Sequence, residues 1–402
     1  MIFKLAWRNL WRSKTRSIIL VVSITIGFFG LFFFYSVMKG ALRQVITNVI
    51  NSGTGHIQIH VKGYLEDPDI KKVIRNPEQI LARLKGPEVA IATKRINLSG
   101  IINSPEETRP VQAIGGILEN ERKITNFARY IIKGKFPEKK RDILMGKELA
   151  ELLKVDVGDK VVITSSDVTG DLSSFGFRVC GIFDTPSLDV NKYVVIIPYS
   201  AASAIAGYSG GANEIVVKLT DSKEIDRVKS KLKKSLGEQF EVLSWDEIYP
   251  LLKYEMEIFS EMMLAFGFII LLAAAFGIAE VFFMSLYERM REIGVLRAIG
   301  LAPGEIAKLV FVESFLLFLV SIGAGGVLNL IFYLYFVHKG INLSIFSRSL
   351  EIWGSGSVIY PYIQIGDIFA MVFLVFFIVF LSVIFPMRKA RKITAVEALK
   401  YV

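Results

Sequence analysis

Four long runs of apolar residues constrain the fold of this chain more than any other feature of its sequence. A helix that crosses a bilayer needs about 20 predominantly apolar residues, and each run is long enough to supply them. The runs are Ser17–Met38, Phe259–Leu286, Ile306–Val337 and Gly366–Phe385. The sequence therefore predicts a membrane protein rather than a large soluble core.

Basic residues flank these runs and predict the orientation of the chain. Met1–Arg16 is basic with no acidic residue, and a second basic cluster follows the fourth run at Pro386–Lys392. Positive charge of this kind stays on the cytoplasmic side. We therefore expect both termini in the cytoplasm and the polar segment Lys39–Ile258 outside. A cleavable signal peptide is the alternative for the N-terminus, but no small-x-small cleavage site follows the first run.

The N-terminal segment also has helical amphipathic character. Trp7 and Trp11 are four residues apart and share one helix face. Such a helix is expected to lie on the inner membrane surface with its indole rings at the level of the headgroups. A shorter amphipathic end, Thr394–Leu399, follows the last basic cluster.

Composition excludes several classes of protein. The net charge of +10 is concentrated beside the apolar runs, so membrane orientation explains it and no nucleic-acid partner is expected. The single cysteine, Cys180, cannot form an internal disulfide and is interpreted as a small core residue. No Walker loop, H-E-x-x-H or G-x-S-x-G motif occurs, so we expect a protein that is not an enzyme and has no cofactor of its own.

A short charged stretch, Tyr287–Glu305, lies between the second and third runs and so on the cytoplasmic side. Its apolar residues recur at spacings that predict a short helix with one apolar side, ended by Gly300 and then Pro303. Two interpretations stay open: a helix resting on lipid headgroups, or a coupling helix that docks on a soluble motor protein. The residues assigned to coupling are Arg289, Arg291, Glu292, Gly294, Leu296, Arg297 and Gly300.

The outside segment predicts an α+β domain. His56–His60 alternates as a strand, Asn76–Glu78 begins a helix, and Val89–Asn97 is a second strand. A similar strand, helix and strand follow from Glu214 to Leu243. These two units, separated by the strand-rich insert Ser99–Ala206, are expected to meet in one layer.

The insert contains a predicted hairpin. Ser165–Gly176 reads as a long tip between the strands Val161–Thr164 and Phe177–Phe183. The residues assigned to this tip are Asp167, Thr169 and Asp171.

Some polar residues leave more than one interpretation. His56 and His60 share a strand face, but without further ligands nearby a metal site is disfavoured. Glu280 and Glu313 lie inside apolar runs, where carboxylates are costly and often functional. Both are near the cytoplasmic ends, so snorkelling or pairing with Arg289, Arg291 or the N-terminal basic helix is favoured. Ser321–Gly326 is expected to be a seam for close helix packing.

The sequence resembles a known family along its whole length. Arg291–Ile306 reads Arg-Glu-Ile-Gly-x-Leu-Arg-Ala-Ile-Gly-x-x-x-x-x-Ile and is similar to the signature between transmembrane helices two and three of FtsX/MacB-type ABC-transporter permeases. The patterns at 134–161 and 177–183 resemble the outside domain of that family. Ala6–Leu10, Gly53–Ile59 and Ser244–Trp245 resemble its lipoprotein-releasing (Lol-type) branch.

The resemblance implies an α-helical membrane protein with four transmembrane helices and an extracytoplasmic α+β (Porter/Sabre-like) domain between helices one and two. The corresponding division is residues 1–38, the outside domain 39–258, and residues 259–402 with a coupling helix at 287–304. It implies a bacterial inner-membrane permease subunit that pairs with a second permease subunit, identical or different. A separate ABC ATPase would bind the ATP and Mg²⁺.

In the lipoprotein-releasing branch, acyl chains enter between the first and second helices of the paired subunits. The matching residues here are Phe29, Phe33, Met38, Phe259, Met263 and Phe266, for which ordinary packing or contact with membrane lipids is the alternative. A periplasmic carrier protein is a further implied partner, but Ser165–Gly176 has neither the Pro nor the Arg of the carrier-recruiting hook. Two other functions stay open: MacB-type efflux of peptides, antibiotics or lipids, and FtsX-like regulation of a cell-wall hydrolase.

Overall fold

The computed structural model describes residues 2–12, 14–208 and 210–392. The chain divides into two compact units. A helical unit contains Met1–Ala41, Met256–Ile341 and Ile359–Val402, and an α+β unit contains Leu42–Glu255 and Asn342–Val358. The predicted amphipathic end Thr394–Leu399 lies outside the described residues.

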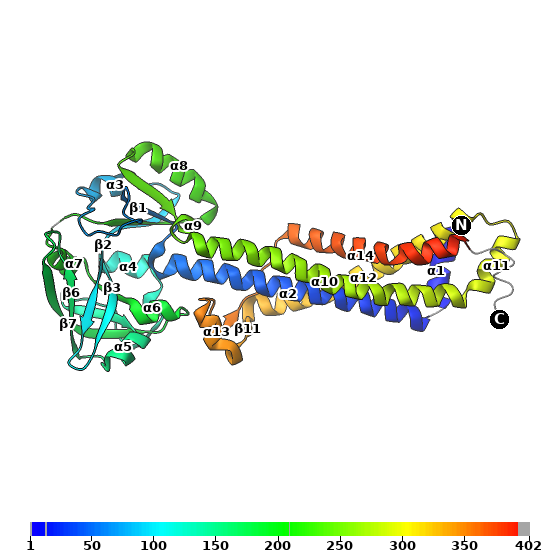
Figure 1. The fold of residues 1–402 in the computed structure, drawn as a ribbon, viewed down its shortest axis with the longest axis horizontal. Coiled ribbons are helices and arrows are strands. Elements are labelled where there is room, and N and C mark those ends of the chain that lie inside the picture. The colour runs from blue at the N-terminus through cyan, green and yellow to red at the C-terminus, as the bar shows by residue number, and fades with distance from the viewer. Residues whose placement is uncertain (1, 13, 209, 393–402) are drawn as a thin grey trace. The chain divides into compact units, whose positions relative to one another are not determined.

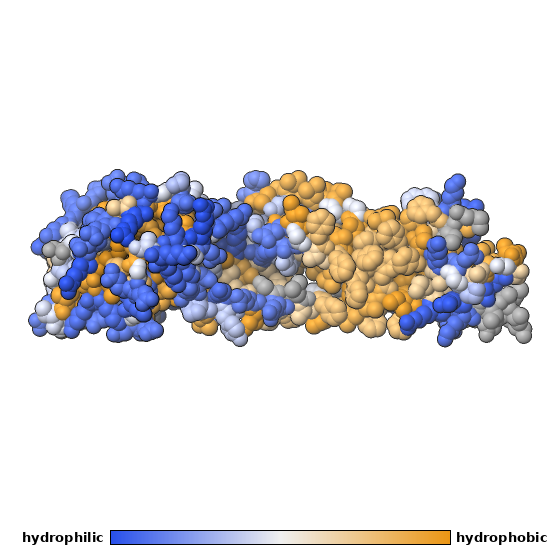
Figure 2. Space-filling model, turned by 90° about the horizontal axis from the view of Figure 1, so that it is seen from above, coloured by the Kyte–Doolittle hydropathy of each residue, from blue (hydrophilic) through white to orange (hydrophobic). Residues whose placement is uncertain are grey.

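Within the described residues, four helices are long and apolar enough to span a membrane, as the sequence predicted. They are α2 (Lys14–Val49), α10 (Pro250–Glu288), α12 (Pro303–Lys339) and α14 (Ile365–Lys392), and Figure 1 shows their course. Figure 2 shows mainly apolar residues on the visible surface of the helical unit and mainly hydrophilic residues over the α+β unit.

Each helix extends beyond its apolar run. Helix α2 continues past Met38 to Val49, and α10 begins at Pro250 rather than at Phe259. Hydrophobicity sets which part of a helix can lie in lipid, whereas the helix itself continues until a residue interrupts it. For α2 the interruption is a π-helical turn, Ile50–Thr54, in which Gly53 has a φ of 128°.

Only part of the predicted packing seam at Ser321–Gly326 contacts another helix, and that helix is α2. Thr25 of α2 donates a hydrogen bond from its hydroxyl to the carbonyl oxygen of Ser321, at 3.1 Å. A Cβ added at Gly325 would lie 2.8 Å from the ring of Phe28, whereas one at Gly326 would meet nothing within 4 Å. Gly325 therefore permits the close approach of α2 and α12.

The N-terminal helix α1 (Ile2–Arg12) packs against α12. Ala6 is fully buried beside Leu309 and Leu316. Trp7 and Trp11 point away from this contact and stay exposed, with their ring centroids 5.9 Å apart. The exposed indoles fit the expected position at the headgroups, while the opposite face joins α1 to the helical unit.

The α+β unit is built on one ten-stranded sheet with the order β10-β1-β9-β2-β3-β8-β5-β7-β4, in which β6 pairs with β2 and β7. Pairs β3–β8 and β5–β7 are parallel and the others are antiparallel. The strands are β1 (Ile57–Val61), β2 (Val89–Asn103), β3 (Thr108–Gly116), β4 (Ile131–Gly134), β5 (Asp142–Gly146), β6 (Lys160–Ser166), β7 (Leu172–Phe183), β8 (Val194–Pro198), β9 (Glu214–Leu219) and β10 (Phe240–Ser244).

The two predicted strand–helix–strand units meet, as expected. Strands β1 and β2 contribute to the same layer as β9 and β10, and Ile57 lies opposite both Ser244 and Val217. Helices α3 (Pro77–Arg83) and α8 (Ile225–Leu236) bury their apolar residues against these strands. The long strand β2 then continues into the insert, where Gly100 lies opposite both Val111 and Ser165. The insert therefore extends the same sheet.

Shorter helices cover the insert and the connections. They are α4 (Leu118–Ile124), α5 (Lys147–Leu153), α6 (Leu188–Tyr193), α7 (Tyr199–Ala206), α9 (Trp245–Ile248) and α13 (Ser347–Ile352), with a two-stranded pair formed by β11 (Ile341–Asn342) and β12 (Val358–Ile359). Buried residues of α5 and α7 share a core with β2, β3 and β5–β8.

The predicted long hairpin tip is wrong in its extent. Strand β6 continues to Ser166 and β7 begins at Leu172, so only residues 167–171 form the turn. Ser, Thr and Gly favour loops, but here the hydroxyls of Thr164 and Ser174 bond to each other across the two strands at 2.8 Å. Cross-strand hydroxyl pairs of this kind stabilise a ladder.

The α2–α12 contact gives a first prediction. Gly325→Leu should destabilise the helical unit, because its side chain must displace Phe28, and overpacking of this kind costs about 1–3 kcal/mol. The measurement is the thermal unfolding of the full chain in detergent. Gly326→Leu is the matched control and should unfold close to the wild-type temperature. Equal unfolding temperatures for the two variants would contradict the assigned contact.

Candidate functional site

The segment between α10 and α12 forms the helix α11 (Met290–Ala298), as the sequence predicted. Gly300, with a φ of 100°, follows its end. Pro303 does not terminate α11 but is the first residue of α12, where the Glu305 carboxylate accepts a hydrogen bond from the Ala302 N–H at 3.2 Å. Proline is well suited to a first helical turn because no intrahelical partner is needed there for its missing N–H.

One face of α11 is buried against the ends of the long helices. Met290 and Ile293 pack in a cluster with Leu286 of α10, Ile306 of α12 and Ala390 of α14. Gly294 is also buried on this face. The cluster therefore joins α11 to α10, α12 and α14.

The prediction of a single apolar side on α11 is wrong. Val295 is 49% exposed and Ile299 is 74% exposed, whereas Ile293 is buried. Residues 293 and 295 are two positions apart, and a helix turns about 200° over that interval. The apolar residues therefore lie on two opposite faces, one packed inside the chain and one available to a partner. Arg291 is exposed on the second face.

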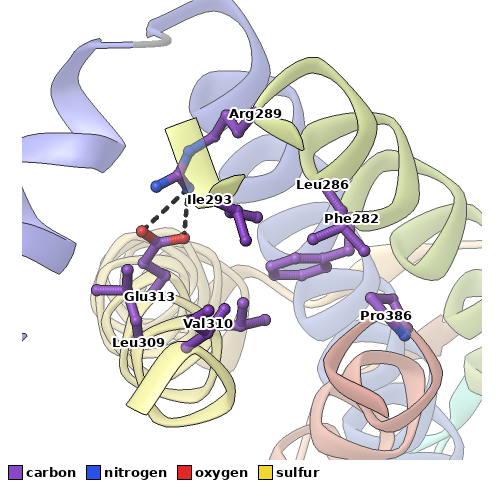
Figure 3. A pocket seen from close by; sticks show the side chains of 9 residues that line it. Phe282, Leu286, Arg289, Ile293, Leu309, Val310, Glu313 and Pro386 are labelled. Carbon is purple, nitrogen blue, oxygen red and sulfur yellow. Dashed lines mark hydrogen bonds and ion pairs between the residues drawn. The ribbon is translucent and has the colours of Figure 1, made fainter. Parts of the chain in front are cut away.

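Charged residues hold α11 to its surroundings. The guanidinium of Arg289 donates to both carboxylate oxygens of Glu313, at 2.9 and 3.1 Å (Figure 3). Its Nε lies 3.5 Å from Glu292. Glu313 is buried and also accepts a hydrogen bond from Asn9 of α1 at 2.8 Å. The expectation that Glu313 pairs with Arg289 or the N-terminal helix is confirmed by contacts with both. Glu280 is exposed.

Two other charged residues assigned to coupling, Glu292 and Arg297, are engaged within the chain. Glu292 forms an ion pair with Arg12, and the neighbouring Glu288 pairs with Arg16. Arg297 donates to the carbonyl oxygen of Leu301 at 3.0 Å. These contacts position α11, and the larger side chains that stay exposed include Arg291, Val295 and Ile299.

A small pocket with a volume of about 20 Å³ lies beside α11. Its walls are mainly apolar and come from α10, α11, α12 and α14, with the Arg289–Glu313 pair at one side (Figure 3). The remaining lining residues are Phe282, Leu286, Ile293, Ile306, Leu309, Val310 and Pro386.

The residues predicted to line an acyl-chain cleft do not form one site within a single chain. Phe29 and Phe33 pack against Phe332 of α12, with ring centroids 5.9 and 5.2 Å apart. Met263 of α10 is buried and lies near Leu31 and Tyr35, on a different side of α2. Phe266 is half-exposed. The two other predicted residues, Met38 and Phe259, are partly buried.

Met263 instead lines a second pocket with residues outside the predicted acyl-chain cleft. Leu31 and Tyr35 of α2 form one wall, and α14 forms another. Tyr35 donates to one carboxylate oxygen of Asp367 at 3.1 Å, and Lys39 binds the other at 2.6 Å. Leu31 and Tyr35 lie two positions from Phe29 and Phe33, so they project from nearly the opposite side of α2.

The hairpin turn at residues 167–171 is held by hydrogen bonds to the side chain of Asp167. One oxygen of Asp167 accepts from the backbone N–H groups of Thr169, Gly170 and Asp171 and from the Thr169 hydroxyl, at 2.6–3.1 Å. The hydrogen bond from the Thr169 side chain, with the backbone donors, holds the pKa of Asp167 below its ordinary value against a small desolvation. Leu172, directly after the turn, is almost fully exposed.

The two histidines of the first strand have separate partners. His56 accepts a hydrogen bond on Nδ1 from the N–H of Leu219 at 3.1 Å, and burial lowers its pKa to about 4. The ring nitrogens of His60 face the Asn213 carbonyl and the Gln58 side chain, at 2.8 and 3.0 Å. In the described residues, no group of three or more His, Cys, Asp or Glu residues is placed to hold a metal ion.

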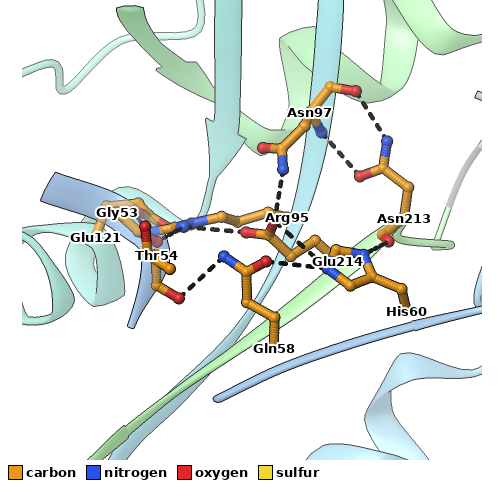
Figure 4. Close-up of polar contacts among 9 residues, drawn as sticks. All are labelled: Gly53, Thr54, Gln58, His60, Arg95, Asn97, Glu121, Asn213 and Glu214. Atoms are coloured by element: carbon orange, nitrogen blue, oxygen red, sulfur yellow. Dashed lines mark hydrogen bonds and ion pairs between the residues drawn. The ribbon is translucent and has the colours of Figure 1, made fainter. Parts of the chain in front are cut away.

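A buried ion cluster in the α+β unit was missed by the sequence analysis. Arg95 of β2 is fully buried and donates to both oxygens of Glu121 at 2.8 and 2.7 Å, and to Glu214 at 3.1 Å (Figure 4). Burial opposes the charge of Arg95, but the two carboxylates outweigh that effect and raise its pKa above the ordinary value. Arg95 also donates to the carbonyl oxygen of Gly53.

This cluster fixes the outer end of α2. Its Gly53 contact and a 2.7 Å bond from Lys218 to Asn51 join the π-helical turn to β2 and β9. The signal in the sequence was weak: Arg95 occupies an inward position on β2, and Glu214 begins β9. Only the pairing of these strands shows that the opposite charges meet.

Family models match both units. A MacB-like periplasmic core domain matches residues 17–235, and an FtsX-like permease C-terminal domain matches residues 264–395. These matches, with the four long apolar helices and the α+β domain between the first two, define a multi-pass membrane protein with a periplasmic domain. The chain belongs to the FtsX/MacB-type ABC-transporter permeases, and membership of this family implies an ATPase partner.

Individual relatives are distant but extensive. The chain is 23% identical to the lipoprotein-releasing system transmembrane protein LolC of Neisseria meningitidis serogroup B, over 95% of this chain and 93% of the relative. It is 22% identical to the macrolide export ATP-binding/permease protein MacB of Escherichia coli O157:H7, over 81% of this chain and 52% of the relative. The periplasmic region of MacB from Actinobacillus actinomycetemcomitans matches with a TM-score of 0.37 and 15% identity, covering 52% of this chain and 97% of that structure.

The buried cluster gives a second prediction. Arg95→Met should lower the free energy of unfolding by about 3–5 kcal/mol, because it leaves Glu121 and Glu214 buried without their counter-ion. The measurement is denaturant or thermal unfolding of the full chain. Arg109→Met is the control, since it removes a partly exposed pair with Glu107, which contributes about 0–1 kcal/mol. Equal losses in both variants would contradict a special role for the cluster.

Proposed function

We propose that this chain is the membrane subunit of an ATP-driven transporter that extracts lipoproteins from the outer leaflet of the bacterial inner membrane. In this proposal both termini and α11 are cytoplasmic, and the α+β unit is periplasmic. ATP and Mg²⁺ bind to a separate ATPase, and a second permease subunit, identical or different, completes the membrane part. A periplasmic carrier is a further candidate partner.

The observation that carries the proposal is the construction of α11. Its inner face is packed into α10, α12 and α14 and is held by the Arg289–Glu313 ion pair. Its outer face presents Val295 and Ile299 with Arg291 beside them. A helix attached in this way transmits a push from a docked ATPase to the long helices, because packed cores move as units rather than deform continuously.

Two observations support lipoproteins as the substrate. The motifs at Ala6–Leu10 and Gly53–Ile59 resemble the lipoprotein-releasing branch, and the LolC relative aligns over nearly the whole chain. The apolar residues Phe33 and Phe266 are exposed on α2 and α10, where a paired subunit would close a cleft for acyl chains. Movement of the helices would then narrow the cleft and release the lipid.

The alternative is efflux of a peptide, antibiotic or lipid, and the MacB relative supports it. The same coupling by α11 would serve that function, so the coupling does not separate the two. An FtsX-like regulator of a cell-wall hydrolase is a third function, and it would use the periplasmic unit without a transported ligand.

A third prediction concerns coupling. Ile299→Asp should reduce ATP-driven substrate release at least tenfold, because it places a charge on the apolar docking face, while the chain still folds and inserts. The measurement is release from proteoliposomes that contain the full complex, with ATP hydrolysis recorded in parallel. Ile132→Asp changes an exposed isoleucine of β4 and is the control. Unchanged release by the Ile299→Asp complex would remove the docking assignment.

A fourth prediction concerns the substrate. Mass spectrometry of the complex, purified in mild detergent without ATP, should detect an acylated protein together with the ATPase and both permease subunits. Lipid-anchored protein is expected because a resting complex holds its substrate before ATP binding. A free small molecule in place of the acylated protein would favour efflux, and a bound hydrolase without a ligand would favour regulation.

A further inference from the structure

The connection between α12 and α14 exposes an unusual group of large apolar side chains. Ser344–Phe346 is a single 3₁₀ turn that leads directly into α13. Ile345 is 92% exposed and Trp353 is 57% exposed, and Phe346 and Ile352 are similarly accessible. Scattered apolar residues are normal on a protein surface, but a continuous group on one short segment usually marks a binding surface. We call residues 344–353 the outer segment.

Hydrogen bonds hold the end of this connection against the last turns of α2. Gln44 donates from its side chain to the Val358 carbonyl oxygen at 2.8 Å, and Asn48 donates to that of Gly354 at 2.7 Å. Gly356 in the same connection lies close to Pro186. A Cβ added at Gly356 would be 3.4 Å from the Cβ of Pro186. Residues that follow the outer segment are therefore fixed, while Ile345, Phe346 and Trp353 within it stay exposed.

Helix geometry gives the depth of the attachment. Gln44 follows Met38, the last residue of the apolar run, by six positions on the continuous helix α2. At about 1.5 Å per residue this is about 9 Å beyond the run. The headgroup layer of a bilayer extends about 5–8 Å beyond its hydrocarbon on each side. The attachment thus lies close to the outer edge of the headgroups.

The chain itself also keeps the outer segment near the bilayer. Helix α12 ends at Lys339, so Ile345 lies at most about 20 Å of extended chain from that end. The last turn of α12 has the residues of a membrane boundary, since the Lys339 ammonium reaches the Tyr335 hydroxyl at 2.7 Å and lies over its ring. Tyrosine with lysine is typical of the membrane–water interface.

The residue types of the outer segment fit the same environment. Tryptophan, phenylalanine and isoleucine beside a basic residue form the usual composition of an interfacial segment that inserts its apolar side chains below the phosphates. Arg348, exposed on α13, supplies that basic residue. A protein partner would also cover apolar side chains, but it would not explain why the segment is attached at headgroup depth between two membrane helices.

We propose that the outer segment inserts Ile345, Phe346 and Trp353 into the outer leaflet and binds phospholipid there. Through the Gln44 and Asn48 hydrogen bonds it would set the position of the outer part of α2 relative to the membrane surface. This goes beyond the proposed function, because it holds whichever substrate the transporter moves.

The fifth prediction tests this depth directly. In a full-length variant with Trp7, Trp11 and Trp245 changed to phenylalanine, Trp353 should be quenched at least twofold by phospholipids brominated on their acyl chains. Quenching should be strongest for bromines near the headgroup end of the chain. The measurement is fluorescence of the protein reconstituted into bilayers. A variant that keeps only Trp245, which is part of α9 in the α+β unit, is the control and should be quenched little.

A second pair of variants separates insertion from folding. Ile345→Ser combined with Phe346→Ser should reduce the quenching of Trp353 and shift its emission to longer wavelength, with an unchanged unfolding temperature. Ile132→Ser should change neither property. If Trp353 is quenched no more than Trp245, the segment does not insert, whether it faces water or a second permease subunit. That result would overturn the proposal and leave the transport assays of the proposed function unaffected.

Discussion

A peptide group inside the hydrocarbon of a bilayer has no water to bond with, and this constraint organises the chain. Its N–H and C=O groups must bond within the segment, which an α-helix achieves. The four apolar runs therefore become the helices α2, α10, α12 and α14. These helices are also long enough to extend into water, so the same elements that cross the membrane connect directly to the parts outside it.

Ion pairs then fix two segments that adjoin these helices. Arg289 and Glu313 join α11 to α12 near one end of the helical unit. Arg95, Glu121 and Glu214 hold the turn after α2 inside the α+β unit. Both sets are largely buried, so losing one partner leaves a charge without solvent or counter-ion. Each set of buried charges therefore holds its own segment in one defined geometry.

Several features of the fold and the site were predictable because local residue patterns carry them. The alternation in Ile57–Val61 placed β1, although that strand is buried on both faces rather than half-buried. The proline at the first position of α3 placed that helix, although the predicted cap, Asn76, makes no side-chain capping bond. The hairpin turn was misjudged because Ser and Thr favour loops but also form cross-strand hydroxyl bonds, as Thr164 and Ser174 do. The faces of α11 were misjudged because periodicity reports which residues are apolar, not which neighbours cover them.

The sequence by itself determined the membrane class, the four spanning helices, the two-part α+β layer and the family, because hydrophobic length and short-range motifs specify them without distant contacts. Only the tertiary structure decided that Ile293 is covered while Ile299 is exposed, that Arg95 meets Glu121 and Glu214, and that Phe29 and Met263 lie in separate environments. Each of these depends on segments far apart in the chain. Their meeting is set by the packing of whole helices and strands, which no local window of residues records.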